Sequence, residues 1–369
     1  MVTLREKFYG CICGAHIGSS MGAVVEGWLH ERTEATYGTL DRLIPYEHYN
    51  NGWLREAGTT EDGIERQKLM ITAIIEKGDR INAEDLRRIW VRDINPLAPG
   101  GISEPYEGEL LKISKVNIPA RDIGRYCDYA NLVTFSRACH PIGMINAGDV
   151  RGAIEDVMEV GQVYHYANTT ALKWACVTAA GIAAAMLPHA TTDSVLQAIF
   201  DHLDERKVVE GRTDGWYGDY AGANLVDELK RALDKTQNCT DHRELRAVLD
   251  TMYYGVGMPY AMAFANEIVT KGICVFRMCG GDLKRAIITA VNLGRDTDCA
   301  AAVAAGLTGA LGGAASLPEE WIQQVDYATS LHRFASSKRT LRECSDGLYG
   351  AFEQRLARMR AYAKEMNIA

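Results

Sequence analysis

The chain has 369 residues, 47% of them hydrophobic, so it is long enough to bury a large core. Its 40 basic and 48 acidic residues give a formal net charge of −8, which argues against nucleic acid or an anionic membrane surface as the main partner. The ten cysteines are scattered and no signal-peptide pattern precedes them, so reduced, mostly buried thiols are expected. We therefore expect a cytoplasmic protein that acts on a small or surface-borne substrate.

Helical periodicity dominates the chain. Apolar residues recur at intervals of three and four in several segments, which are residues 64–76, 83–91, 149–163, 169–186, 194–203 and 225–233. Asn82 and Thr192 precede acidic residues and are typical helix N-caps. Convincing strands are hard to find. The pattern predicts an all-α fold, and no low-complexity linker divides it, so we expect one domain over residues 1–369.

Two further segments stand out from this pattern. Residues 94–125 contain four prolines and several glycines, which predicts a long irregular connection of the kind that is often functional. Residues 300–315 are rich in alanine but are interrupted by glycines and a threonine. They fall short of the roughly 18 uninterrupted apolar residues that a membrane span needs. No membrane helix is expected.

A pair of acids precedes this alanine-rich segment. Asp296 and Asp298 follow Gly294, so they are expected on a loop and in the first turn of a helix. Acids at that position cap unpaired backbone N–H groups and interact favourably with the helix dipole. Capping explains one acid well, but a second adds repulsion unless a cation neutralises it.

A second acidic cluster has the same design. Thr60, Glu61 and Asp62 stand immediately before the helical segment at residues 64–76. Hard cations such as Mg²⁺ take oxygen ligands from carboxylates, carbonyls and water. Two acidic helix openings that met in a bundle could hold one or two such ions. Ordinary helix caps remain the alternative explanation for both clusters.

Together with a glycine-rich element near the N-terminus, these clusters resemble the ADP-ribosylglycohydrolase family, which includes the dinitrogenase-reductase-activating and ADP-ribosylarginine hydrolases. The matching elements are GAHIGSSMGAVVE at residues 14–26, TED at residues 60–62, and GRDTDC at residues 294–299 followed by a helix of small residues. Their order and spacing fit the family over most of the chain. The C-terminal element is the most specific of the three.

The resemblance implies a compact orthogonal helical bundle with two Mg²⁺ ions in a cleft, Mn²⁺ being possible instead. By position, it implies that the metal ligands are Thr60, Glu61, Asp62, Asp296 and Asp298. Glu26 would be the catalytic acid close to the metals, with Asp62 beside it. The small-residue helix would let neighbouring helices approach closely enough for the two clusters to converge.

The sequence also departs from the family pattern. Ser19 stands where the family usually has Asp, Glu61 lengthens an Asp side chain by one methylene, and Cys299 replaces a Thr. A thiol is a poor ligand for a hard ion. The glycine-rich element that lies against the nucleotide in many members is replaced by LVTFSRACH at residues 132–140, so the glycines that let a backbone approach a pyrophosphate are missing.

Aromatic and polar residues near this altered stretch are candidates for substrate binding. Tyr126, Tyr129 and Phe135 lie beside several arginines, Arg137 among them, and could stack a base and pair with an acidic group. Aromatic residues at this spacing are, alternatively, ordinary core. His165 and Asn168 fall where the family tends to have a histidine-containing element, although a lone histidine is more often a packing residue.

Three functions remain open. The first is a metal-dependent hydrolase that cleaves the ribosyl bond of an ADP-ribosylated protein or an ADP-ribosyl small molecule. The second is an N-ribosidase acting on a nucleoside-like substrate that lacks the ADP group, which the altered stretch at residues 132–140 favours. The third, from another class, is a catalytically inactive relative that keeps the bundle as a binding or structural protein.

Overall fold

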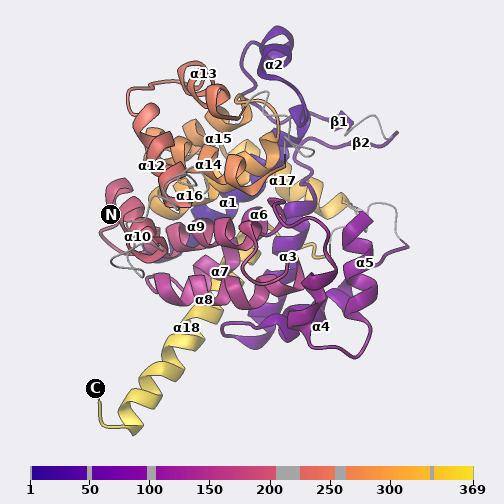
Figure 1. Cartoon of the computed structure of the whole chain (residues 1–369), viewed down its shortest axis with the longest axis vertical. Coiled ribbons are helices and arrows are strands. Elements are labelled where there is room, and N and C mark those ends of the chain that lie inside the picture. The colour runs from indigo at the N-terminus through magenta and orange to yellow at the C-terminus, as the bar shows by residue number, and fades with distance from the viewer. Residues whose placement is uncertain are drawn as a thin grey trace, which may run out of the picture.

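The computed structural model describes residues 2–47, 52–97, 105–204, 225–253, 263–332 and 336–368. Residues 98–104, part of the predicted irregular connection, lie outside these ranges. The described chain is mostly helical (Figure 1), which confirms the all-α prediction. A short antiparallel pair, β1 (Tyr46–Glu47) and β2 (Leu54–Arg55), supplies the strands of the described residues.

The α-helices, in chain order, are α1 (Leu4–Gly22), α2 (His30–Tyr37), α3 (Asp62–Lys77), α4 (Ala83–Asp93), α5 (Pro105–Ser114), α6 (Thr134–Ala138), α7 (His140–Ile145), α8 (Val150–Val160), α9 (Thr170–Ala185), α10 (Thr192–Leu203), α12 (Leu225–Lys235), α13 (His242–Tyr253), α14 (Ala265–Cys279), α15 (Leu283–Val291), α16 (Thr297–Gly312), α17 (Glu319–Leu331) and α18 (Leu341–Glu365). Short 3₁₀ helices are η1 (Ala23–Val25), η3 (Ala120–Tyr126) and η4 (Gly161–Val163).

The predicted helices are present, with small differences at their ends. Asn82 caps α4 in a reciprocal capping box with Asp85, as expected. The cap of α10 is Thr191 rather than Thr192, because the Thr191 hydroxyl accepts the backbone N–H of Ser194. The predicted connection at residues 94–125 contains α5 and η3, so its prolines do not exclude regular structure.

A tightly packed pair of helices, α1 and α16, forms the centre of the fold (Figure 1). Glycines and alanines line their contact at intervals of about one turn. A Cβ atom at Gly14 would lie 2.1 Å from the carbonyl oxygen of Ala305, and one at Gly10 would lie 2.3 Å from that of Gly309. Only glycine fits at these α1 positions because the facing backbone occupies the space. Small residues therefore set the close approach of the two helices.

The other helices enclose this central pair. Helices α9, α14 and α15 pack against α16, whereas α3, α17 and α18 pack against α1. The far end of α18 extends away from the body towards the C-terminus (Figure 1). One hydrophobic core runs from Phe8 to Phe352. All ten cysteines fall within the described ranges as free thiols, eight of them buried, which confirms the expectation of unpaired and mostly buried thiols.

Among the described residues, one segment, Leu4–Val25, is long and apolar enough by composition to cross a membrane. In the structure, 94% of its most apolar window is buried inside the fold. Its apolar surface packs against α16, α15 and α18. The apolar side chains of this segment therefore form part of the hydrophobic core.

Candidate active site

The site forms where the chain leaves α1 and enters α16. The backbone N–H of Gly27 donates to the carbonyl of Arg295 at 2.8 Å, and the N–H of Arg295 donates to the carbonyl of Trp28 at 2.6 Å. The Thr297 hydroxyl donates to the carbonyl of Gly22 at 2.7 Å. These bonds tie the residue after η1, Glu26, to the beginning of α16.

A buried ion-pair network stabilises the backbone at the beginning of α16. Arg295 has a φ of +71°, a left-handed conformation that costs free energy for a residue with a Cβ atom. Its guanidinium donates two hydrogen bonds to Glu267, at 2.7 and 2.8 Å. Lys271 also donates to Glu267 at 2.7 Å. The network fixes the conformation of the residue that immediately precedes Asp296.

Asp296 and Asp298 open α16 as predicted. Asp296 is the N-cap and accepts the backbone N–H of Cys299 at 3.3 Å, while Asp298 lies in the first turn. Both carboxylates are almost fully buried. Ligand atoms of Asp296, Asp298 and Cys299 lie within 4.8 Å of one another. Among the described residues, no hydrogen-bond partner is found for the buried Oδ1 atom of Asp298.

The negative charges of Asp296, Asp298 and Glu26 repel one another unless a cation compensates them. Burial raises the pKa of Asp296 well above its ordinary value, and the nearby charges of Asp298 and Glu26 raise it further. Burial likewise raises the pKa of the Cys299 thiol, which stays protonated at neutral pH and is a poor partner for a hard ion. Two carboxylates and Glu26 are thus gathered in a buried place where a divalent cation would relieve their repulsion.

The second predicted cluster lies at the beginning of α3. Asp62 Oδ2 accepts a hydrogen bond from Arg137 at 2.7 Å, and the Nη1 atom of the same guanidinium is 4.0 Å from Asp298 Oδ2. The openings of α3 and α16 therefore converge on Arg137. Burial would raise the pKa of Asp62, but the charges of Arg137 and Arg66 outweigh it and lower this pKa.

The other two members of the second cluster have partners of their own. Glu61 accepts a hydrogen bond from the Tyr46 hydroxyl and lies 3.2 Å from the guanidinium of Arg55. The Thr60 hydroxyl lies 3.4 Å from the ammonium group of Lys68. Arg55, Tyr46 and Lys68 are all buried. Each predicted ligand of this cluster is thus paired with a cationic or polar group of the chain.

The two clusters consequently differ in how well they suit a metal ion. At Asp296 and Asp298, the closely spaced buried carboxylates, one oxygen of which has no partner among the described residues, fit a hard divalent cation. At Thr60, Glu61 and Asp62, the side chains already contact cations of the protein. The donor atoms of α16 therefore fit an ion better than those of α3.

The predicted substrate-binding residues differ in how far their side chains are exposed. Phe135 and His165 are fully buried in the core, where Phe135 packs against Tyr164 and burial lowers the pKa of His165 to about 4. Tyr129 is half-buried against Tyr106. Tyr126 and Asn168 are exposed on the surface. Phe135 and His165 have no exposed surface with which to contact a substrate.

Several of the described residues that contact the acidic clusters are not predicted as part of the site. The sequence suggests Arg137 as a partner for an acidic group of the substrate, but in the structure Arg137 pairs with Asp62. Tyr46 lies in β1 and Arg55 in β2, and strands of two residues are too short to be predicted from a sequence pattern. Basic residues near buried acids were the available signal, but their pairing depends on the fold.

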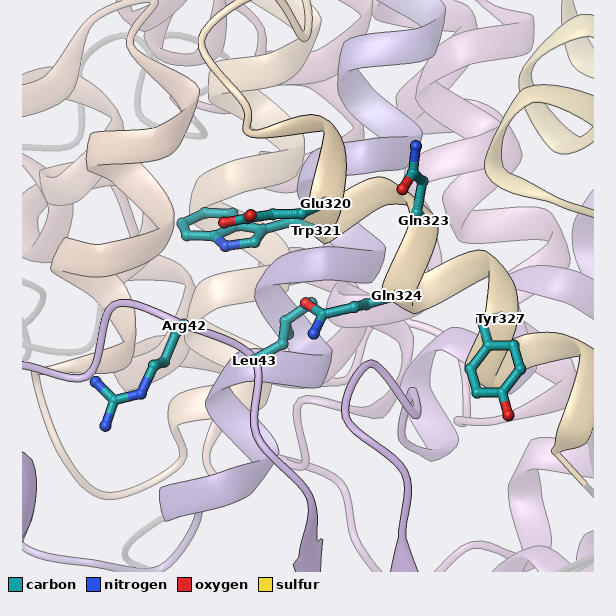
Figure 2. Close-up of a pocket in the computed structure, with 7 residues that line it drawn as sticks. All are labelled: Arg42, Leu43, Glu320, Trp321, Gln323, Gln324 and Tyr327. Atoms are coloured by element: carbon teal, nitrogen blue, oxygen red, sulfur yellow. The ribbon is translucent and has the colours of Figure 1, made fainter.

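A surface pocket lies elsewhere, between α17 and the loop that follows α2. Figure 2 shows the residues that line it, which are Arg42, Leu43, Glu320, Trp321, Gln323, Gln324 and Tyr327. None of these is a member of either acidic cluster. The pocket is mixed in chemistry and brings together no group of acids. We therefore take the acidic clusters, and not this pocket, as the candidate active site.

Fold and site together define a class of all-α proteins in which acidic helix openings converge beside a central pair of helices. The sequence profile described as ADP-ribosylglycohydrolase matches residues 1–355. The chain belongs to the ADP-ribosylglycohydrolase family. Family membership supports a glycohydrolase activity.

Two relatives of low identity span most of the chain, and both are described as uncharacterized. An uncharacterized protein of Archaeoglobus fulgidus is 24% identical over 329 residues, which are 87% of this chain and 92% of that protein. The uncharacterized protein YegU of Escherichia coli (strain K12) is 24% identical over 356 residues, 91% of this chain and 99% of YegU.

A solved structure titled ADP-ribosylglycohydrolase-related protein complex is similar at a TM-score of 0.64 and 15% identity. The match covers 96% of this chain and 99% of that one. At this identity the similarity establishes the fold alone. It places this chain's all-α architecture with that of the family.

Proposed function

We propose that this protein is a metal-dependent glycosidase that hydrolyses a ribosyl bond, with Mg²⁺ held by Asp296 and Asp298. The observation that carries the proposal is the buried pair of carboxylates at the opening of α16, with Glu26 beside them. One oxygen of Asp298 has no hydrogen-bond partner in the part of the chain that the structure describes. Like charges gathered out of water are costly unless a cation or a proton compensates them. Family membership supplies the reaction class.

A bound divalent ion supplies a positive charge that orients hydroxyl groups and water and stabilises negative charge. The residues of the chain have distinct tasks around it. Glu26 is half-buried and close enough for its charge to act on Asp296, which supports a role in exchanging a proton with water or with the leaving group. Asp296 and Asp298 would hold the ion, and a carboxylate of Glu26 would favour the positive charge that develops on an oxocarbenium-like sugar. Arg137 holds Asp62 in a fixed orientation.

Two substrate classes remain within this function, and one observation bears on the choice. All five residues of α6 are buried, and α6 packs against α9. This segment replaces the glycine-rich element that would approach a pyrophosphate, and it offers no exposed loop for that purpose. The burial of α6 favours an N-ribosyl substrate without the ADP group, whereas family membership favours an ADP-ribosyl substrate.

A hydrolysis assay separates these possibilities. Metal-free protein would be incubated with ADP-ribosylarginine or with a purine nucleoside, with and without Mg²⁺, and released ADP-ribose or ribose would be measured by chromatography. We expect Mg²⁺-dependent release from one of the two. Glu26→Gln should lower kcat by about 10²–10⁴, because it removes the proton-exchanging group, and should change substrate binding less.

Glu31→Gln is the matched control, since Glu31 is an exposed carboxylate on α2, five residues further along the chain. It should keep the activity of the unaltered protein. Absence of turnover for both substrates in protein that has bound Mg²⁺ would contradict the proposal and favour an inactive relative. Equal kcat for Glu26→Gln and the unaltered protein would remove Glu26 from the mechanism.

A further inference from the structure

A buried arginine lies between the two acidic clusters. The Nη2 atom of Arg137 donates to Asp62 Oδ2 at 2.7 Å, and its Nη1 atom donates to the Cys299 sulfur at 3.1 Å and lies 4.0 Å from Asp298 Oδ2. One guanidinium therefore contacts the opening of α3 and the opening of α16. Its side chain is 9% exposed, and those of Asp62 and Asp298 are 11% and 2% exposed. The pairing is shielded from the solvent that weakens surface ion pairs.

Several features of the fold place Arg137 in this position. Gln67 donates its side-chain amide to the backbone carbonyl of Arg137 at 2.8 Å, which fixes α6 against α3. Gly63, the second residue of α3, leaves room for the arginine. A Cβ atom at Gly63 would lie 2.7 Å from Cδ and 3.0 Å from Nε of Arg137. Contacts this short with the middle of a side chain would force it to move. The absence of a side chain at Gly63 is thus a condition for the Arg137–Asp62 bond.

Cations of the chain also neutralise the rest of the α3 cluster. Arg55 lies 3.2 Å from Glu61, and Lys68 lies 2.7 Å from Glu65 and 3.4 Å from Thr60. The α16 cluster is different. Among the described residues, Asp298 forms one ion pair, the 4.0 Å contact of its Oδ2 atom with Arg137. No hydrogen-bond partner is found in these residues for Asp298 Oδ1. Side-chain cations therefore lie closer to the acids of α3 than to those of α16, where Arg137 is 4.0 Å from Asp298.

We propose that the centre holds one divalent cation, at Asp296 and Asp298, and that the Arg137 guanidinium takes the place of a second one between Asp62 and Cys299. The inference rests on the proposed function, because it assumes the ion at α16. A guanidinium stays protonated throughout the physiological pH range and forms directed hydrogen bonds with carboxylates. It also gives the site a permanent positive charge that does not depend on metal supply. The expectation of two ions is replaced by one ion and one arginine.

The Cys299 side chain fits this arrangement. A thiol is a weak ligand for Mg²⁺ but can accept a hydrogen bond from an arginine, as it does here from Nη1. The substitution of Thr by Cys that would weaken a two-ion centre is therefore compatible with a centre in which the second cation is a guanidinium. The Arg137, Gly63 and Cys299 side chains form one consistent set.

The test counts bound ions. Mn²⁺ would be titrated into the metal-free full chain, and the signal of free Mn²⁺ would be followed by electron paramagnetic resonance. We expect one Mn²⁺ per chain. Asp62→Asn should keep this ion because Asp62 is already paired with Arg137, whereas Asp298→Asn should lose it. Arg137→Met should bind a second Mn²⁺, because the acids of both openings are then released from the guanidinium.

Two further variants separate the proposed effect of Arg137 from misfolding and from the general loss of an arginine. Gly63→Ala retains every charged side chain but pushes Arg137 away from Asp62, so it should also gain a second ion. Arg80→Met is the matched control: Arg80 makes a two-bonded pair with Asp156 away from the site, at 2.7 and 2.6 Å, and its loss should leave the count at one.

Each result decides something different. Two ions in the unaltered protein would overturn the inference and leave the proposed function intact. One ion in the unaltered protein and in both Arg137→Met and Gly63→Ala would show that Arg137 does not replace a cation. No ion at all in the unaltered protein would overturn the proposed function, and the inference with it.

Discussion

Gly22 of α1 lies against the backbone of Asp298 on α16: a Cβ atom at Gly22 would stand 2.5 Å from the Cα atom of Asp298. The same glycine accepts the hydrogen bond of the Thr297 hydroxyl through its carbonyl. The close packing of α1 and α16 thus extends directly into the acidic site. A substitution that disturbs the contact between α1 and α16 at this end should therefore also shift the proposed metal ligands.

Gly22→Ala should weaken both the fold and the metal site. The added methyl group has no space, so we expect a loss of about 1–3 kcal/mol in the free energy of unfolding, together with weaker Mg²⁺ binding because Asp298 must shift. Urea unfolding and calorimetric Mg²⁺ titration measure the two effects. Gly350→Ala on α18, where an added Cβ has nothing within 4 Å, is the control and should be neutral or stabilising by up to about 1 kcal/mol. Equal behaviour of the two variants would contradict this account of the contact.

Asp298→Asn should stabilise the protein when no metal is bound. Asp296 has a folded-state pKa raised by burial, by Asp298 and by Glu26. The stability of the metal-free protein therefore falls as pH rises above the unfolded pKa of about 4. Removing the Asp298 charge relieves part of this penalty, and we expect a gain of about 1 kcal/mol at pH 7.

The same variant should lose its response to Mg²⁺. In the unaltered protein, Mg²⁺ at about 100 times its Kd should add about 2.7 kcal/mol of stability. Thermal unfolding in EDTA and in Mg²⁺ measures both effects. Asp346→Asn, which removes one partner of an exposed ion pair with Arg5, should leave the Mg²⁺ response unchanged. An Asp298→Asn protein that is stabilised by Mg²⁺ as strongly as the unaltered protein would refute the ligand assignment.

His140 should make the fold sensitive to acid. Its Nδ1 atom accepts a hydrogen bond from Gln67 at 3.1 Å and its Nε2–H donates to the carbonyl of Ala302 at 2.9 Å, an arrangement that suits the neutral ring. Burial lowers the pKa of His140 to about 4. The unfolded chain, with a histidine pKa of about 6.5, binds the proton more readily, so stability is lost as pH falls from about 6.5 to about 4.

The loss attributable to this one ring should reach up to about 3 kcal/mol at the acid end of that range. Urea unfolding from pH 7.5 to pH 4.5 would measure it. His140→Gln should show a shallower decrease, although His165, whose pKa burial also lowers to about 4, keeps its own contribution. Identical pH dependence in the variant and the unaltered protein would remove His140 from this effect.

Local signals explain which parts of the structure could be predicted. Asp296 is identified as an N-cap because the cap, its acids and the following apolar helix are contiguous in the sequence. Helix α5 escapes prediction because its first residue is Pro105, and proline is tolerated at a first helical position although it breaks a helix interior. The Thr191 cap is missed by one residue because threonines stand at both positions.

The contacts of the site could not be predicted in this way. The sequence suggests Phe135 for base stacking, but its position in the short helix α6 directs its side chain into the core. Arg137, two residues further on, points to Asp62 and Cys299, which are 75 and 162 residues away in sequence. Neither partner is visible from local spacing because the meeting of α3, α6 and α16 is a property of the whole fold.

The central claim is that the metal ion at Asp296 and Asp298 is what lets this protein bind a ribosyl group. Calorimetric titration of ADP-ribose, and of ribose as the smaller ligand, into the Mg²⁺-loaded protein and into the protein in EDTA tests it most directly. We predict binding of at least one of the two ligands that requires Mg²⁺ and disappears in Asp298→Asn. Binding of equal affinity in EDTA, or no binding of either ligand to protein that holds its metal, would contradict the claim.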